Sequence, residues 1–183
     1  NHRFALLSKI YLGDILDGDD DISLSIKLYK EALYNTKDLD VGLLAAKKIA
    51  DKSLDDKVFQ EAKIHYSKIL DKQEDYILQD LDNAYSLSKK LRLNGLNLLA
   101  GRIIESLSKR VDKENFPDKH EEYIFEAASL FANNDNNKSI FYFQKYLKEY
   151  PEGMNARAAR RELDFLLFKA EDEKKPMDQL EYL

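Results

Sequence analysis

The sequence is poor in the residues that disulfide-bonded, hairpin-rich and membrane-spanning proteins need. It contains no cysteine, which excludes disulfides and thiolate chemistry. Six glycines and three prolines among 183 residues make tight hairpin turns scarce and loops short. No run of 18 apolar residues occurs, so no membrane-spanning helix is predicted. These absences favour an all-α protein.

Charge and apolar content narrow the class further. Charged residues make up 34% of the chain, with a net charge of −5 and both signs interspersed. A nucleic-acid-binding protein would show a basic face or stripe, and none is present, so no nucleic-acid partner is predicted. Apolar residues make up 44%, which suffices for the core of one domain at this length.

Apolar residues recur at helical spacing in successive segments of the chain. In the stretch 139–151, for example, Ser139, Phe143 and Tyr146 fall on one helical face, and Pro151 ends the helix. The same analysis predicts nine helices, at 3–16, 22–34, 38–54, 56–71, 74–93, 96–111, 118–133, 139–151 and 155–169.

The helices form pairs, and the second helix of each pair carries a similar set of buried positions. Each set holds a small residue, then an aromatic or apolar one, then another small or apolar one. The sets are Ser25/Tyr29/Ala32, Ala62/Tyr66/Ile69, Ala100/Ile104/Leu107 and Ser139/Phe143/Tyr146. Their first positions lie 37, 38 and 39 residues apart, so the chain is predicted to be a repeat protein.

Residues Leu12-Gly13, then Ser25, Tyr29 and Ala32, with Pro151 closing the last repeat, resemble the tetratricopeptide-repeat family. The resemblance covers about residues 3–151, although alanine or serine replaces the family's glycine in later repeats. It implies an all-α fold, an α-solenoid of about four helix-turn-helix repeats followed by a C-terminal capping helix. The implied divisions are a solenoid over 1–170, with repeats 3–37, 38–73, 74–114 and 115–151 and a cap 153–170, and a flexible tail 171–183.

The segment FQKYLKEYPEGMNARAARREL is similar to repeats of bacterial envelope proteins, namely outer-membrane assembly lipoproteins and the periplasmic cell-division coordinator. That similarity implies a periplasmic or envelope location, with the cytoplasm as the alternative. Because the sequence opens at Asn1 rather than Met, we expect a fragment or a processed form. Membrane association is then expected only through a missing N-terminal anchor or through a partner.

Candidate catalytic and metal sites are sparse. The three histidines, His2, His65 and His120, show no metal-ligand spacing. No P-loop, no GxGxxG and no Ser/His/Asp order is present. The sequence therefore predicts no enzyme, no metal, no cofactor and no small-molecule substrate.

In the family that the chain resembles, peptide ligands lie in a concave groove lined by the first helix of each repeat. Transferring the groove positions by register gives Leu44, Lys47, Asp51, Tyr85, Lys89, Arg92, Ile124 and Phe131. Of these, Lys47, Lys89 and Arg92 are suited to hold a ligand carboxylate, the alternative being ordinary solvated cations.

The last predicted helix offers a second candidate surface. Its apolar face holds Leu163, Leu166 and Leu167, and Phe165 and Phe168 lie away from that face. Exposed apolar residues rimmed by charge mark interfaces, so one of these rings is predicted to contact a partner, a second protomer or another part of the chain.

Three functions fit these features. The first is a non-enzymatic adaptor, placed by the resemblance in a bacterial envelope, that holds another protein in the groove or on the last helix. The second is a structural subunit that oligomerises through that helix. The third is a cytoplasmic regulatory or chaperone-like module.

Overall fold

The computed structural model describes residues 2–18 and 22–172, and all of its elements are helices, without a strand in the described part. The prediction of an all-α fold is therefore confirmed. The helices are α1 (His2–Gly18), α2 (Ile22–Asn35), α3 (Leu39–Asp55), α4 (Phe59–Gln73), α5 (Asp75–Leu78), α6 (Leu81–Leu93), α7 (Asn97–Arg110), α8 (Pro117–Phe131), α9 (Asn136–Glu149) and α10 (Ala156–Asp172).

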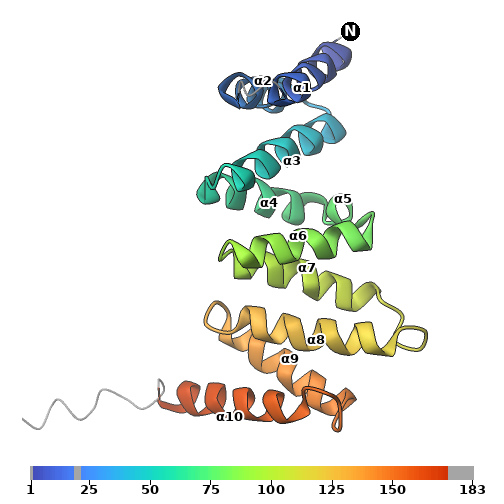
Figure 1. The fold of residues 1–183 in the computed structure, drawn as a ribbon, viewed down its shortest axis with the longest axis vertical. Helices are drawn as coiled ribbons and strands as arrows, with labels where there is room; N and C mark the ends of the chain where they lie inside the picture. Colours follow the sequence, from blue (N-terminus) through green and yellow to red (C-terminus); the bar gives the residue numbers. More distant parts are fainter. Residues whose placement is uncertain (1, 19–21, 173–183) are drawn as a thin grey trace, which may run out of the picture.

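The helices pack in chain order into an elongated stack. Figure 1 shows α1 and α2 at one end and α10 at the other, with the remaining helices lying across the long axis between them. Consecutive helices pack on one another, both in the pairs α1–α2, α3–α4, α6–α7 and α8–α9 and from one pair to the next at α2–α3, α7–α8 and α9–α10. We call α1, α3, α6, α8 and α10 the first-row helices and α2, α4, α7 and α9 the second-row helices.

Helix boundaries follow local capping chemistry. The side chains of Asp38 and Asp135 accept backbone hydrogen bonds, each of 3.1 Å, at the starts of α3 and α9. Pro117 opens α8, where its missing N–H costs nothing. Gly95, with φ of +75°, follows the end of α6 in the left-handed conformation that glycine adopts without strain.

The single helix predicted over 74–93 is wrong, because the structure divides it into α5 and α6. Asp80 lies between them in an extended conformation, and its carboxylate accepts hydrogen bonds from the backbone N–H groups of Asp82 and Asn83, both 3.0 Å. This is the geometry of an N-cap, so a new helix starts where the apolar spacing alone runs on. The short α5 then buries Ile77 and Leu78.

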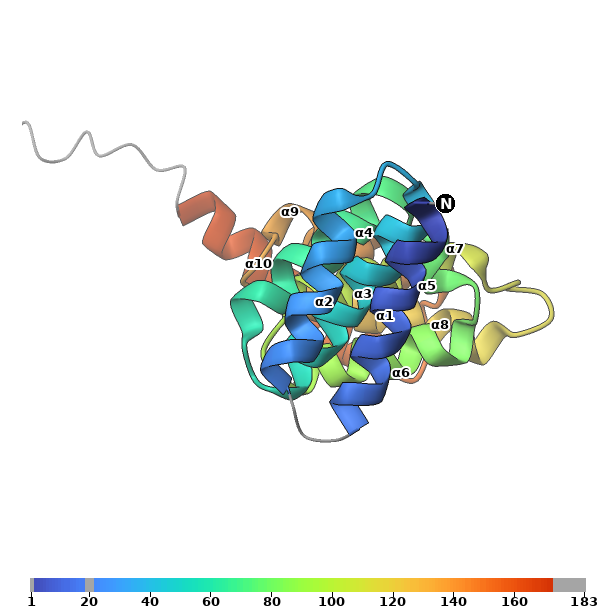
Figure 2. The same cartoon turned by 90° about the horizontal axis from the view of Figure 1, so that it is seen from above.

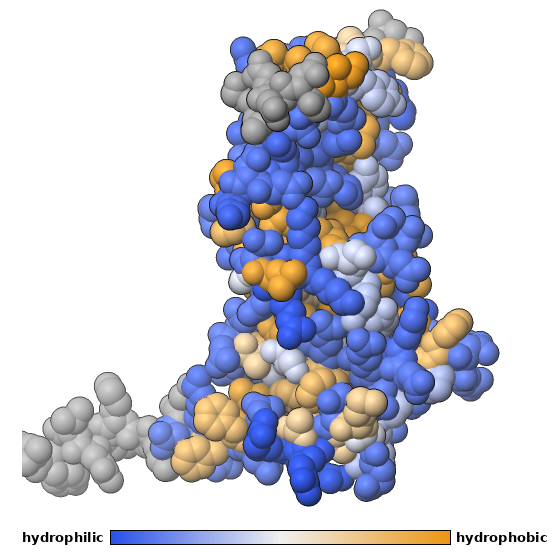
Figure 3. Space-filling view, viewed as in Figure 1, coloured by the Kyte–Doolittle hydropathy of each residue, from blue (hydrophilic) through white to orange (hydrophobic). Residues whose placement is uncertain are grey.

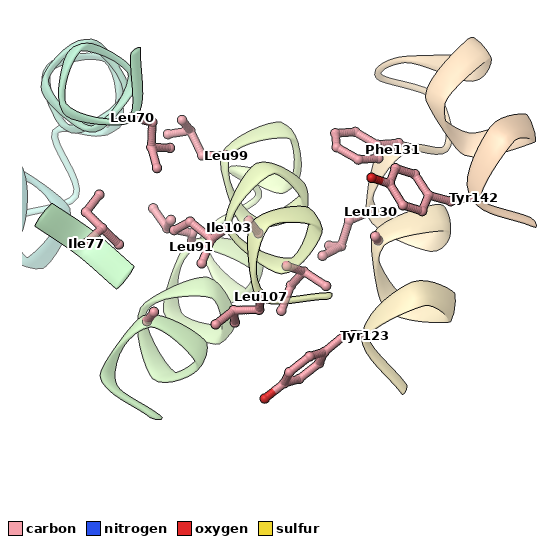
Figure 4. Packing of buried hydrophobic residues seen from close by; sticks show 14 of the residues in the cluster. Leu70, Ile77, Leu91, Leu99, Ile103, Leu107, Tyr123, Leu130, Phe131 and Tyr142 are labelled. Carbon is pink, nitrogen blue, oxygen red and sulfur yellow. The ribbon is translucent and has the colours of Figure 1, made fainter. Parts of the chain in front are cut away.

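The buried apolar side chains form two clusters. The larger one runs from α3 to α10, and Figure 4 shows Leu91, Ile103 and Leu107 meeting where α6 packs on α7. The smaller one joins α1, α2 and α3. Because neighbouring pairs share apolar residues, no single pair completes its own core.

The first two pairs repeat one polar contact. The Tyr29 hydroxyl donates to Asp14 over 2.8 Å, and the Tyr66 hydroxyl donates to Asp51 over 2.6 Å. Both bonds span 15 residues, and Asp14 and Asp51 lie 37 residues apart in the sequence. The pair α3–α4 therefore repeats α1–α2 in register.

Ion pairs also link successive first-row helices. Lys48 lies 2.8 Å from Asp14 and Lys52 lies 2.9 Å from Asp17, which ties α3 to α1.

No helix in the described ranges is both long and apolar enough to cross a membrane. The helix α10 ends at Asp172, so the first two residues of the predicted tail 171–183 are helical, and 173–183 lie outside the described residues.

Candidate functional site

Three of the predicted groove residues line one hollow between α6 and α8. Tyr85, Lys89 and Arg92 follow one another on α6 at helical spacing and face a space of about 250 Å³. Its remaining walls come from α8 and from the turn before α10, and consist of Glu122, Phe125, Glu126, Ser129 and Asn155. We call this space the α6–α8 hollow.

Polar contacts across the hollow hold its two helices together. The Tyr85 hydroxyl donates to Glu122 over 2.7 Å, and Arg92 lies 3.3 Å from Glu126. The Lys89 ammonium lies 4.0 Å from the centre of the Tyr85 ring, a cation–π contact. The walls thus carry two cations, two carboxylates and two aromatic rings, those of Tyr85 and Phe125.

The carboxylates differ in their surroundings. The Glu126 side chain is only 12% exposed, and burial raises its pKa, although Arg92 counteracts part of that effect. Burial and the hydrogen bond to Glu122 raise the pKa of Tyr85, so this phenol remains a neutral donor at physiological pH. Arg92 is therefore needed to compensate a buried acid, whereas Glu122 is held by a neutral hydroxyl.

Lys89 is the cation of the hollow that is left for a ligand. Among residues 2–18 and 22–172, no carboxylate lies within 4 Å of its ammonium group. The Arg92 side chain is 60% exposed, and its Nη1 alone is hydrogen-bonded to Glu126, so its other N–H groups make no hydrogen bond within the described ranges. Together the two side chains can bind a carboxylate beside the aromatic wall.

The other predicted polar groove residues lie elsewhere. Lys47 is 2.6 Å from Asp51 and lines a separate space of about 440 Å³ formed by α3, α5 and α6. Asp51 also accepts the Tyr66 hydroxyl and lines a third space, of about 260 Å³, between α1 and α3. Leu44 is half-buried against the smaller core cluster. These residues do not join the α6–α8 hollow.

The assignment of Ile124 and Phe131 to the groove is wrong. Both are 0% exposed and belong to the larger core cluster. Phe131 stacks on Tyr142 with ring centres 6.0 Å apart, which turns it toward α9 (Figure 4). The helical spacing of Tyr123, Ala127 and Phe131 is the sequence signal for this burial, because such a stripe faces the core.

The sequence prediction missed the residues of α8 that do face the hollow. Glu122, Phe125, Glu126 and Ser129 are spaced i, i+3, i+4 and i+7 and so form one stripe of the helix. Their mixed polar character could have marked this stripe as the solvent-facing side of α8. Asn155 reaches the same hollow from the turn before α10, and no local pattern predicts that.

The two phenylalanines of α10 are exposed. Phe165 is 58% and Phe168 is 66% exposed, whereas Leu166 is buried at 4%. Ala156 and Ala159 attach the start of α10 to the stack, and its other end extends away from it (Figure 2). Both rings are accessible, and their contact with a partner stays a prediction.

A further hollow was not predicted at all. It measures about 560 Å³ and opens between α2, α3 and α4 over an apolar floor of Leu33, Leu43, Ala46 and Ile69. Lys37, Lys68 and Lys72 stand around it. These residues come from three helices and from the connection between α2 and α3, and only tertiary packing brings them together.

Neither a search for metal-binding side chains nor comparison with known proteins assigns a function to the chain. Within the described part of the chain, no three His, Asp or Glu side chains are placed to hold a metal ion. No protein-family model matches the chain, and no curated protein matches it significantly.

Proposed function

We propose that the chain is a non-enzymatic interaction scaffold of the tetratricopeptide-repeat type, an α-solenoid that binds an acidic peptide segment of another protein. The binding site is the α6–α8 hollow. The observation that carries this proposal is the convergence of Tyr85, Lys89 and Arg92 on one space, with no carboxylate of the described residues within 4 Å of the Lys89 ammonium group.

The chemistry of the hollow favours a peptide over a small substrate. Its volume, about 250 Å³, is below the usual range for small-molecule pockets, and it is open to solvent along α6 and α8. One carboxylate fits between Lys89 and Arg92, and an adjacent apolar or aromatic side chain fits against Tyr85 and Phe125. The ligand is therefore a segment with Asp or Glu next to an apolar residue.

A charge-reversal experiment tests this site. A panel of fluorescein-labelled peptides, each with Asp or Glu beside an aromatic or aliphatic residue, is titrated with the protein and followed by anisotropy. For a peptide that binds, the double variant Lys89→Glu/Arg92→Glu is expected to weaken affinity at least tenfold. Lys89→Glu alone leaves the Arg92–Glu126 pair in place and should reproduce most of that loss.

The matched control reverses two charges elsewhere. Lys63 and Lys148 are exposed, lie on the second-row helices α4 and α9, and make no ion pair within 4 Å among the described residues. Lys63→Glu/Lys148→Glu should leave the affinity within about twofold. An unchanged affinity of the Lys89/Arg92 variant, or an equal loss in the control, would disprove the site.

A second candidate function rests on α10. The exposure of Phe165 and Phe168 supports an oligomerising subunit that uses this helix as its contact. Light scattering over a range of concentrations distinguishes the two functions. Only the second function predicts an oligomer, and the variant Phe165→Ser/Phe168→Ser should then be a monomer. For either function we propose the location that the resemblance implies, the bacterial envelope.

A further inference from the structure

The outer face of α1 carries an apolar stripe that no described residue covers. Phe4, Tyr11, Leu12 and Ile15 are 63%, 60%, 47% and 64% exposed, and Ser8 lies between them on the same helical face. Figure 3 shows the corresponding end of the stack with apolar surface, in orange, over α1 and α2. Four large exposed apolar side chains on one helix mark an interaction surface.

The repeat register shows which residues of α3 are equivalent to this face of α1. The repeated Tyr–Asp hydrogen bonds place Asp14 of α1 and Asp51 of α3 in equivalent positions, 37 residues apart. With the same offset, Phe4, Ser8 and Leu12 correspond to Val41, Ala45 and Ile49.

In α3, this stripe is buried. Val41, Ala45 and Ile49 are 1%, 0% and 0% exposed and share the smaller core cluster with Tyr29 and Ala32 of α2. The face is thus the one with which a first-row helix packs on the second helix of the preceding pair. On α1, the same face has no such helix among the described residues.

The flanking positions differ between α1 and α3 in a way that defines the partner. In α3, the next residues at this edge are Lys48 and Lys52, which reach the carboxylates Asp14 and Asp17 of α1. In α1, the equivalent positions hold Tyr11 and Ile15. A second partner helix, placed beside α1 as α1 lies beside α3, would therefore meet Tyr11 and Ile15 instead of two lysines, so the partner needs no row of acids there.

We propose that the Phe4–Ile15 face of α1 is a docking surface for an amphipathic helix that presents a stripe like that of α2, with a small residue, an aromatic one and a small one at i, i+4 and i+7. The helix lies on α1 as α2 lies on α3, which continues the established packing between pairs by one step. This surface is at the opposite end of the stack from α10 and is independent of the α6–α8 hollow (Figure 1).

A tandem duplication supplies the missing helix in register. A copy of residues 1–37 placed before Asn1 positions a second α2 ahead of α1, with a connection as long as the one that joins α2 to α3 and with Asn1 in the place of Asp38. Because the chain has no cysteine, Leu12→Cys in the original copy reports the accessibility of the stripe by its rate of thiol labelling. The duplication is expected to slow this labelling at least tenfold relative to the variant of normal length.

Controls separate the outcomes. Leu93→Cys, at a position 86% exposed on α6, should label equally fast in both proteins. As an independent probe, a synthetic peptide of residues 22–37, added in millimolar excess to the Leu12→Cys variant, should slow its labelling in trans. If neither the duplication nor the peptide slows labelling at position 12, the proposal is wrong. Labelling that instead slows as the concentration of the normal-length protein rises would assign the face to a second copy and would also overturn it.

Discussion

Gly153 is expected to be the glycine least tolerant of substitution, because it lies against a hydrogen-bonded turn that attaches α10. Glu121 accepts hydrogen bonds from the Tyr146 hydroxyl and from the backbone N–H of Met154, the latter over 2.8 Å. The Tyr146 oxygen in turn accepts from the N–H of Asn155 over 2.9 Å. A Cβ at Gly153 would lie 2.6 Å from that oxygen and closer still to the Glu121 carboxylate, so both groups must move.

The expected cost follows from these contacts. A neutral hydrogen bond contributes about 1 kcal/mol and one to a charged group about 2 kcal/mol, so losing two of the three costs about 3 kcal/mol. The smaller entropy of the unfolded alanine variant returns less than about 1 kcal/mol. Gly153→Ala should therefore lower the free energy of unfolding by about 2–3 kcal/mol, which is about 5–10 °C in Tm for a chain of this size.

Urea and thermal unfolding followed by circular dichroism at 222 nm measure this loss, and limited proteolysis in the α9–α10 turn shows whether α10 detaches first. Gly42→Ala is the matched control, because its Cβ would meet only Thr36 Cγ2, at an ordinary 3.5 Å. It should be as stable as the parent chain or up to about 1 kcal/mol more stable, since alanine favours a helix. The reasoning fails if the two variants unfold within about 0.5 kcal/mol of each other.

Two further predictions concern the core. Gly13→Ala should lower the free energy of unfolding by about 1–2 kcal/mol, because the added Cβ would lie 2.6 Å from the buried Tyr29 ring. This loss is expected although alanine has the better helix propensity. A urea unfolding curve equal to that of Gly42→Ala would contradict it. Burial lowers the pKa of His65 and His120 below the ordinary 6.5, so the unfolded chain binds more protons and stability should fall as the pH drops from 7 to 5.5. His65→Gln/His120→Gln should flatten that slope in chemical denaturation, and an unchanged slope would assign it to other groups.

Much of the fold could be predicted from the sequence because its signals are local. The apolar stripes of the helices, the closing Pro151 and the Asn94-Gly95 stop all act within a few residues of the positions they determine. The break between α5 and α6 was missed because Ile77, Leu81 and Ala84 keep helical spacing across it. The hydrogen bonds made by the Asp80 side chain outweigh that spacing, and many aspartates elsewhere in the chain do not start a helix.

The candidate site could be predicted only in part, because it depends on how one helix is turned against the next. The three predicted residues of α6 line one space, since their spacing within one helix fixes their common direction. On α8 the transferred register chose Phe131, which is core, and passed over Glu126. If the transferred register is rotated to the wrong face of a helix, buried positions are taken for exposed ones. The sequence alone does not show which stripe of α8 opposes α6.

Which charges are already paired decides where an acidic ligand gains most. An acid entering the α1–α3 space would compete with Asp14 and Asp17 for Lys48 and Lys52, and would meet Asp51 and Asp55 in the same wall. Such exchange of one surface ion pair for another yields little free energy. The α6–α8 hollow also has carboxylates in its walls, Glu122 and Glu126, but among the described residues none of them lies within 4 Å of the Lys89 ammonium group. A ligand carboxylate there adds a pair instead of replacing one, which is the physical reason to expect acidic segments at α6 and α8 rather than along the whole first row.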